Sequence, residues 1–153
     1  AAPVRTLNES DANELGFSRE TLRRLEKLAV LHPEPKKGGR VYHREDVEIL
    51  RILQQMNERG FSPARGWPLE ALSIYVETAQ RLAEKEVEQL FQKMVDGLNP
   101  QDTQDLFSDT GEDLFLGLFL WMRRKSMKKA FAAHLKRMKE TGVKKVLDTG
   151  KGG

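Results

Sequence analysis

Apolar positions at helical spacing alternate with turn residues in the first part of the chain. Between residues 18 and 29 they predict one buried stripe, formed by Leu22, Leu25, Leu28 and Ala29. Ser18 precedes this stripe and can accept a hydrogen bond from the Thr21 backbone N–H, as a helix N-cap does. We therefore expect a helix that begins after Ser18.

A shorter helix is expected just before it. Asn8, with Asp11 three residues later, is a second N-cap signal, so residues 9–15 are predicted to be helical. Gly16 then provides a turn between the two helices. Two short helices joined by a turn form a helix-turn-helix, whose second helix enters the major groove of DNA in proteins that use this motif.

A hairpin and a third helix are predicted next. Gly38 and Gly39 stand between candidate strand residues, and three cations lie close by: Lys36, Lys37 and Arg40. Such a cationic hairpin, or wing, is suited to straddle a phosphate backbone. From Asp46 apolar residues again follow helical spacing, and the helix is expected to stop at Gly60.

The middle of the chain carries a long apolar seam after a break at residues 63–68. Its spacing repeats every eleven residues, which predicts a nearly straight stripe along a helix of about 30 residues, 69–98. The seam consists of Leu72, Val76, Ala79, Ala83, Val87, Leu90, Met94 and Leu98. One protomer does not easily bury so long a stripe, so we expect a homodimer. A core helix that packs only on the chain's own C-terminal region is the alternative.

Two further helices are predicted at 101–107 and 112–140, the second capped by Asp109. Residues 114–122 carry no charge, are too few to span a bilayer, and are expected to be buried. The basic residues that follow suit a helical cap on the dimer coil; an anionic membrane surface or nucleic acid is the alternative partner. We expect a disordered tail at 141–153.

Composition limits the functional classes. The 153 residues are 39% hydrophobic and 32% charged, and they include no Cys, which excludes thiolate metal sites, iron–sulfur ligation and disulfides. The three His residues are widely spaced, so we expect no metal site. The sequence offers no phosphate-binding Gly loop and no nucleophile with a matched base, so we predict neither enzyme activity nor a cofactor. We identify no export signal and no membrane-spanning segment.

The net charge of +3 conceals three blocks of different sign. Residues 1–66 hold 12 basic and 10 acidic residues, residues 67–114 hold 3 and 11, and residues 115–153 hold 11 and 2. The blocks therefore carry +2, −8 and +9. Because the acidic middle and the basic end attract each other, the basic end need not be a second DNA site.

Taken in order, these residues resemble the MerR-type winged-helix transcription regulators. The matching positions extend over about residues 7–62 and are Ser18, Thr21, Leu22, Arg23, Glu26, Leu31, Pro33, Arg40, Tyr42, Asp46, Val47, Gly60, Phe61 and Ser62. Three residues depart from the family pattern. Arg24 and Leu25 replace the usual aromatic pair, and Ala29 replaces the usual Gly.

The resemblance implies a mostly α-helical protein with a winged helix-turn-helix head at 5–62. A helical dimerisation and effector-sensing region at 67–140 would follow the head. The recognition helix and the wing would contact double-stranded DNA through Ser18, Arg19, Thr21, Arg23, Arg24, Lys36, Lys37, Arg40 and Tyr42. For Tyr42, packing under the wing is an equal alternative.

The function implied is that of a homodimeric transcriptional regulator on promoter DNA. RNA polymerase or a small-molecule effector is a further expected partner, and a bacterial, cytoplasmic, nucleoid-associated location would follow. An effector pocket could use the aromatic residues Phe91, Phe107, Phe115, Phe119 and Trp121, but a small helical core would use the same residues, and we favour the core. Two rival functions stay open: a MerR-like protein-interaction module, such as a co-chaperone modulator, and an architectural role in recombination.

Overall fold

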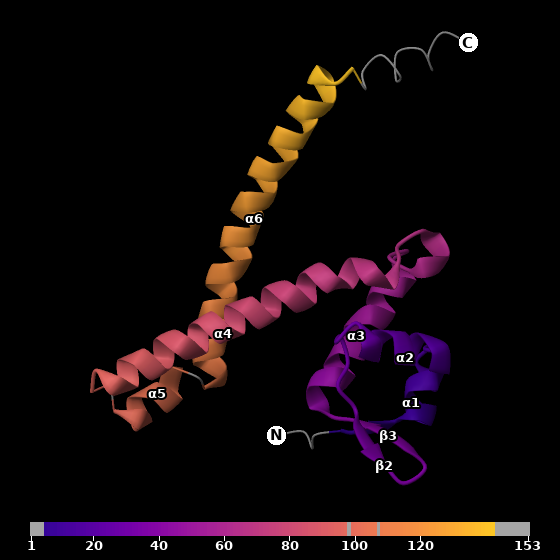
Figure 1. Ribbon diagram of the computed structural model, residues 1–153, viewed down its shortest axis with the longest axis horizontal. Coiled ribbons are helices and arrows are strands. Elements are labelled where there is room, and N and C mark those ends of the chain that lie inside the picture. The colour runs from indigo at the N-terminus through magenta and orange to yellow at the C-terminus, as the bar shows by residue number, and fades with distance from the viewer. Residues whose placement is uncertain (1–4, 98, 107, 143–153) are drawn as a thin grey trace. The chain divides into compact units, whose positions relative to one another are not determined.

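The computed structural model describes residues 5–97, 99–106 and 108–142, which are mostly helical (Figure 1). The chain divides into two compact units, the first ending at Glu88 and the second beginning at Gln89, within the long helix α4 (Ser73–Val95). The predicted head, 5–62, lies within the first unit. The predicted region 67–140 extends over both units.

The helix-turn-helix is formed by α1 (Glu9–Glu14) and α2 (Arg19–Lys27). Asn8 and Asp11 form a reciprocal capping box at the start of α1, where the Asp11 backbone N–H donates to Asn8 Oδ1 at 2.8 Å. At the start of α2, the Thr21 backbone N–H donates to Ser18 Oγ at 3.1 Å. Both predicted helices and both predicted caps are therefore confirmed.

The wing provides two strands of a three-stranded antiparallel sheet in the order β1-β3-β2. Strands β2 (Glu34–Lys36) and β3 (Gly39–Tyr42) form the predicted hairpin, and Gly38 in its turn has φ of 82°. Strand β1 (Leu7–Asn8) was not predicted. It pairs Leu7 with Tyr42, and two residues are too short to show the alternating pattern of a strand.

Helix α3 (Arg44–Glu58) begins two residues before the predicted start at Asp46. Asp46 is instead a buried residue of its first turn, and its Oδ2 accepts the His32 backbone N–H at 2.9 Å. The chain leaves α3 at Gly60, where φ is 92°. The core of this unit lies among α1, α2, α3 and the sheet, and its buried apolar members are Ala12, Phe17, Leu22, Leu25, Val30, Leu31, Tyr42, Val47 and Leu50.

Two 3-10 turns, η1 (Pro63–Arg65) and η2 (Leu69–Leu72), precede α4. The helix predicted over 69–98 therefore begins with a 3-10 turn, and its α-helical part covers a shorter range. Trp67, between the turns, packs edge-on against Phe61 with ring centroids 5.3 Å apart. Leu72 and Val76 pack against the core of the head, so the first seam residues already have a partner in their own chain.

The second unit contains α5 (Pro100–Leu106) and α6 (Asp109–Glu140). The cap of α6 is Ser108 and not Asp109, because Ser108 Oγ accepts the Gly111 backbone N–H at 3.4 Å. The apolar run 114–122 was expected to be buried, but in the single chain its large side chains are 39–73% exposed. Phe107 and the predicted tail beyond Gly142 lie outside the described residues.

Candidate nucleic-acid interface

A network of ion pairs connects the second helix of the helix-turn-helix to the wing. Arg23 Nη2 on α2 donates to both carboxylate oxygens of Glu9 on α1, at 2.9 and 2.8 Å. Arg23 Nη1 lies 3.3 Å from Glu26 Oε1, and the same oxygen lies 2.8 Å from Arg40 Nε on β3. Glu26 therefore holds an arginine of the helix and an arginine of the wing on one carboxylate.

This network is partly shielded from solvent. The side chains of Arg23 and Glu26 are only 23% and 16% exposed. Burial acts to lower the pKa of the Arg23 guanidinium, but the hydrogen bond that Arg23 donates to Glu9 and the charge of Glu26 outweigh it and raise the pKa. Arg23 thus stays charged with both Nη nitrogens engaged. It serves as a bridge, whereas the sequence had suggested an open contact residue.

Tyr42 belongs to the core. Its side chain is fully buried, and within the described part of the chain its hydroxyl forms no hydrogen bond of good geometry. Burial and the nearby Glu26 raise the pKa of this hydroxyl, and Arg23 opposes them. Of the two roles predicted for Tyr42, packing under the wing is the one that its burial supports, because a buried ring does not reach a phosphate.

Arg24 is paired as well, with a residue far along the chain. Its Nη2 contacts Glu70 Oε1 on η2, and both side chains are about half exposed. Sequence reasoning gave no sign of this contact, since Glu70 lies 46 residues downstream and belongs to no motif. The pair brings the segment after the head next to the predicted recognition helix.

The remaining predicted contact residues are open to solvent or lie at the start of α2. Arg19 has a side chain that is 79% exposed, and its Nε lies 3.8 Å from Glu9. Lys36 and Lys37 at the tip of the wing are exposed and, among the described residues, form no ion pair. Ser18 Oγ also donates to Thr21 Oγ1 at 3.0 Å, so both hydroxyls take part in the cap of α2.

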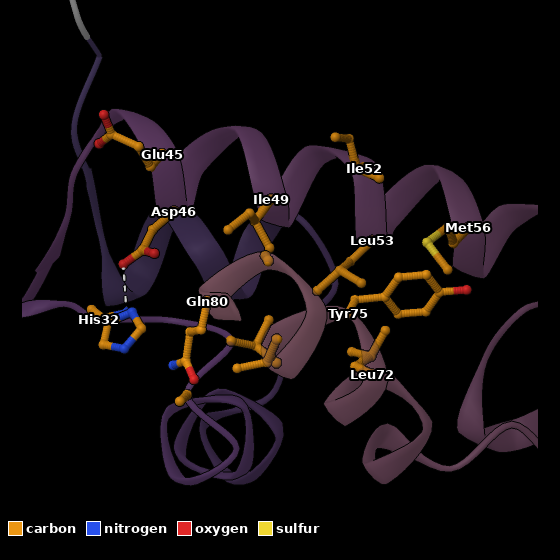
Figure 2. A pocket seen from close by; sticks show the side chains of 14 residues that line it. His32, Glu45, Asp46, Ile49, Ile52, Leu53, Met56, Leu72, Tyr75 and Gln80 are labelled. Carbon is orange, nitrogen blue, oxygen red and sulfur yellow. Dashed lines mark hydrogen bonds between the residues drawn. The ribbon is translucent and has the colours of Figure 1, made fainter. Parts of the chain in front are cut away.

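An apolar groove of about 630 Å³ lies on another part of the same unit, between α3 and the start of α4. Figure 2 shows Ile49, Leu53, Met56 and Tyr75 around it, with the His32–Asp46 hydrogen bond at one end. Three predicted seam residues, Leu72, Val76 and Ala79, line the groove. The groove therefore continues the apolar seam from α4 onto the head.

Comparison with known proteins identifies the head. Residues 12–65, about a third of the chain, match the model of a family described as MerR HTH family regulatory protein. The N-terminal unit contains a MerR-type helix-turn-helix domain. The helix-turn-helix and its wing therefore match those of a family of regulatory proteins, and the resemblance seen in the sequence is confirmed. Neither the curated proteins nor the solved structures gave a match.

The match covers the end of α1, all of α2, the wing and α3, and it ends at Arg65, before η2 and α4. Arg23, Glu26 and Arg40 all lie within the matched residues, and Glu70 lies outside them. Among the described helices, none combines the length and the hydropathy that crossing a bilayer requires. The described residues also contain no group of three His, Asp or Glu side chains placed to hold a metal ion.

Proposed function

We propose that the protein is a sequence-specific transcriptional regulator that binds promoter DNA as a homodimer. The observation that carries this proposal is the Arg23–Glu26–Arg40 network, because it joins the recognition helix and the wing of a MerR-type domain into one surface. The exposed cations Arg19, Lys36 and Lys37 lie on the same two elements. Phosphate binding by cations on a rigid pair of elements is the main source of affinity for duplex DNA.

The role of each residue would follow from its surroundings. Lys36 and Lys37 on the wing would contact phosphates, and so would Arg40, whose side chain is 33% exposed beside its pair with Glu26. Arg19 and Thr21, at the start of α2, would face the major groove. Arg24 would join them after exchanging Glu70 for DNA, which costs little because an exposed ion pair is weak.

Dimerisation would use the exposed part of the α4 seam. Val87 is 45% exposed, Ala83 is exposed, and Leu90 and Met94 are half-buried in the single chain. Two helix-turn-helix heads in a dimer read two half-sites about one helical turn apart. Such a regulator would act in the bacterial cytoplasm on the nucleoid, with RNA polymerase or a small effector as further partner.

The proposal is tested by selecting duplexes from a random library and measuring their affinity over a range of salt concentrations. Lys36→Gln with Lys37→Gln should weaken binding and lower the salt slope by about one for each phosphate that is no longer bound. The matched control is Lys85→Gln with Lys93→Gln, which removes two exposed charges from α4. If no duplex is enriched, or if both double variants lose affinity equally, the proposal is wrong.

A protein-interaction module is the second candidate, and one observation favours it. Arg23, Arg24 and Arg40 all pair with carboxylates, so much of the positive charge of the head is already neutralised. Chromatography on random-sequence DNA with a rising salt gradient separates the two functions. A DNA-binding protein is retained to moderate salt, whereas a protein-docking module elutes at the start of the gradient.

A further inference from the structure

One face of α6 carries acidic, apolar and basic residues in that order. Its members follow steps of three or four positions, with an adjacent charged pair at each end of the leucines, which keeps them on one side of the helix. They are Glu112, Asp113, Leu116, Leu120, Arg123, Arg124 and Met127. In the single chain Leu116 is 55% exposed and Leu120 is 42% exposed. Apolar side chains that repeat on an exposed helix face indicate a surface that another helix covers.

The charged residues of this face are available for a partner. Within the described residues, the side chains of Glu112, Asp113 and Arg123 form no ion pair and no hydrogen bond with another side chain. Arg124 forms no ion pair within the described residues and lies over the ring of Trp121, with 4.7 Å from its guanidinium carbon to the ring centroid. An acidic patch and a basic patch are therefore both exposed, with leucines between them.

Six of these residues, all except Met127, are placed symmetrically about position 118. Leu116 and Leu120 lie two positions on either side of it, Asp113 and Arg123 five, and Glu112 and Arg124 six. When two copies of one helix pack antiparallel, each residue faces its mirror position on the other copy. Every acid would then face an arginine, and Leu116 would face Leu120. A parallel pair would instead bring like charges together, which is unfavourable.

We propose that α6 pairs antiparallel with α6 of a second copy of this chain, through the face that contains Leu116 and Leu120. Leu118 lies on the opposite side of the helix and takes no part in this contact. The contact is separate from the α4 seam, and it does not depend on DNA binding. The α6 helix of the second copy would cover the apolar residues of this face, and opposite charges would meet at both ends of the contact.

Disulfide trapping in the full chain tests the proposal directly, because the chain contains no Cys that would interfere. A Leu116→Cys chain is mixed with a Leu120→Cys chain and oxidised. The proposed pairing would place these two positions opposite each other, and a disulfide forms when the Cα atoms are roughly 4.4–6.8 Å apart. The control is Leu118→Cys, the same residue type at 56% exposure on the opposite face. We expect the mixed pair to cross-link at least about tenfold faster than the control.

Charge reversal on the same background tests the orientation. Arg123→Glu with Arg124→Glu in both chains should slow the cross-link severalfold. Placing Glu112→Arg with Asp113→Arg in one chain, and the arginine reversals in the other, should restore it, because each contact again joins opposite charges. Circular dichroism checks that every variant keeps its helix content. Equal cross-linking by Leu118→Cys, or no rescue by the paired reversals, overturns the proposal whether or not the protein binds DNA.

Discussion

Ala29 is the residue whose backbone is least suited to its side chain. Among the described residues it is the one non-glycine with positive φ, at 60°, and it follows α2 where the family usually has Gly. The left-handed conformation costs an alanine about 1–2 kcal/mol, and part of this is offset because glycine is more flexible when unfolded. The backbone at Ala29 is therefore strained, because its side chain carries a half-buried methyl group that glycine lacks.

Ala29→Gly is expected to stabilise the head by roughly 0.5–1 kcal/mol, since the strain disappears while the fold is kept. Urea unfolding should show a higher midpoint with an unchanged slope. Ala71→Gly is the matched control, because Ala71 is exposed and its φ is negative; this change should be neutral or destabilising. A lower midpoint for Ala29→Gly would contradict the strain at this position.

Glu26 has two conceivable effects on DNA binding, and replacing it by Gln would change the affinity in opposite directions in the two cases. If it acts only as a negative charge near DNA, Glu26→Gln should strengthen binding. Because it holds Arg23 and Arg40 together, we expect the opposite, a severalfold loss of affinity, with faster amide exchange in β2 and β3. Glu20→Gln, on the exposed side of α2, is the control and should bind at least as well as the natural chain. If both variants bind DNA more tightly than the natural chain, Glu26 does not position Arg23 and Arg40 for DNA binding.

Asp46 links stability to pH. Burial raises the pKa of its carboxyl above 3.8, although the hydrogen bond from His32 opposes this. The charged form is thus disfavoured in the folded state, so the contribution of Asp46 is most favourable below pH 3.8 and is lost as pH rises through the raised pKa. Asp46→Asn keeps an acceptor for His32 and removes the charge. In urea unfolding, we expect the stability of the variant relative to the natural chain to rise as the pH rises from 3.8 through the raised pKa; a difference that stays constant with pH would contradict this.

At the scale of elements, the contact between η2 and α2 places a carboxylate on the recognition helix. Glu70→Gln should free Arg24 and strengthen binding to a selected duplex up to about fivefold, the range expected for an exposed pair. Glu77→Gln, an exposed acid on α4, is the control for a general change of charge. Equal gains for the two variants would mean that only net charge changed and that the specific pair with Arg24 has no effect on DNA.

The elements that depend on local chemistry could be predicted from the sequence. Asn8 and Ser18 predicted the starts of their helices because an N-cap acts on backbone groups within three residues. Gly38 predicted the turn of the wing. Strand β1 and the ion pairs of Glu26 and Glu70 could not be predicted in this way. They depend on residues brought together from distant parts of the chain, and neither short strands nor single acids carry a periodic signal.

The same distinction applies to the candidate site. The sequence predicted that Arg23 and Arg40 lie on neighbouring elements, because the order of helix and hairpin determines which elements meet. In the structure both side chains contact Glu26. It could not show that Arg23 would use both Nη nitrogens on carboxylates, because the partner Glu9 was assigned only to the first helix. Tyr42 had two predicted roles, and its burial depends on how β3 packs against the core of the head.

At the scale of the whole molecule, the buried apolar residues are distributed unevenly. Every buried hydrophobic residue of the described chain lies in the first unit, between Ala12 and Leu50. The described part of the second unit instead exposes large apolar side chains along α6. A helix of this kind gains most of its stability from packing, so the second unit should depend on association in a way that the head does not.

The two tryptophans allow this dependence to be measured, because each unit contains one. Trp67→Phe leaves Trp121 on α6 as the reporter, and Trp121→Phe leaves Trp67, which packs against Phe61 in the first unit. Thermal unfolding is followed by fluorescence over a roughly hundredfold range of protein concentration. The midpoint reported by Trp121 should rise with concentration, since association stabilises the folded form by mass action, while the midpoint reported by Trp67 should change much less. If both midpoints are independent of concentration, the second unit is stable without a partner, and the exposed apolar residues of α6 need another explanation than a second copy of the chain.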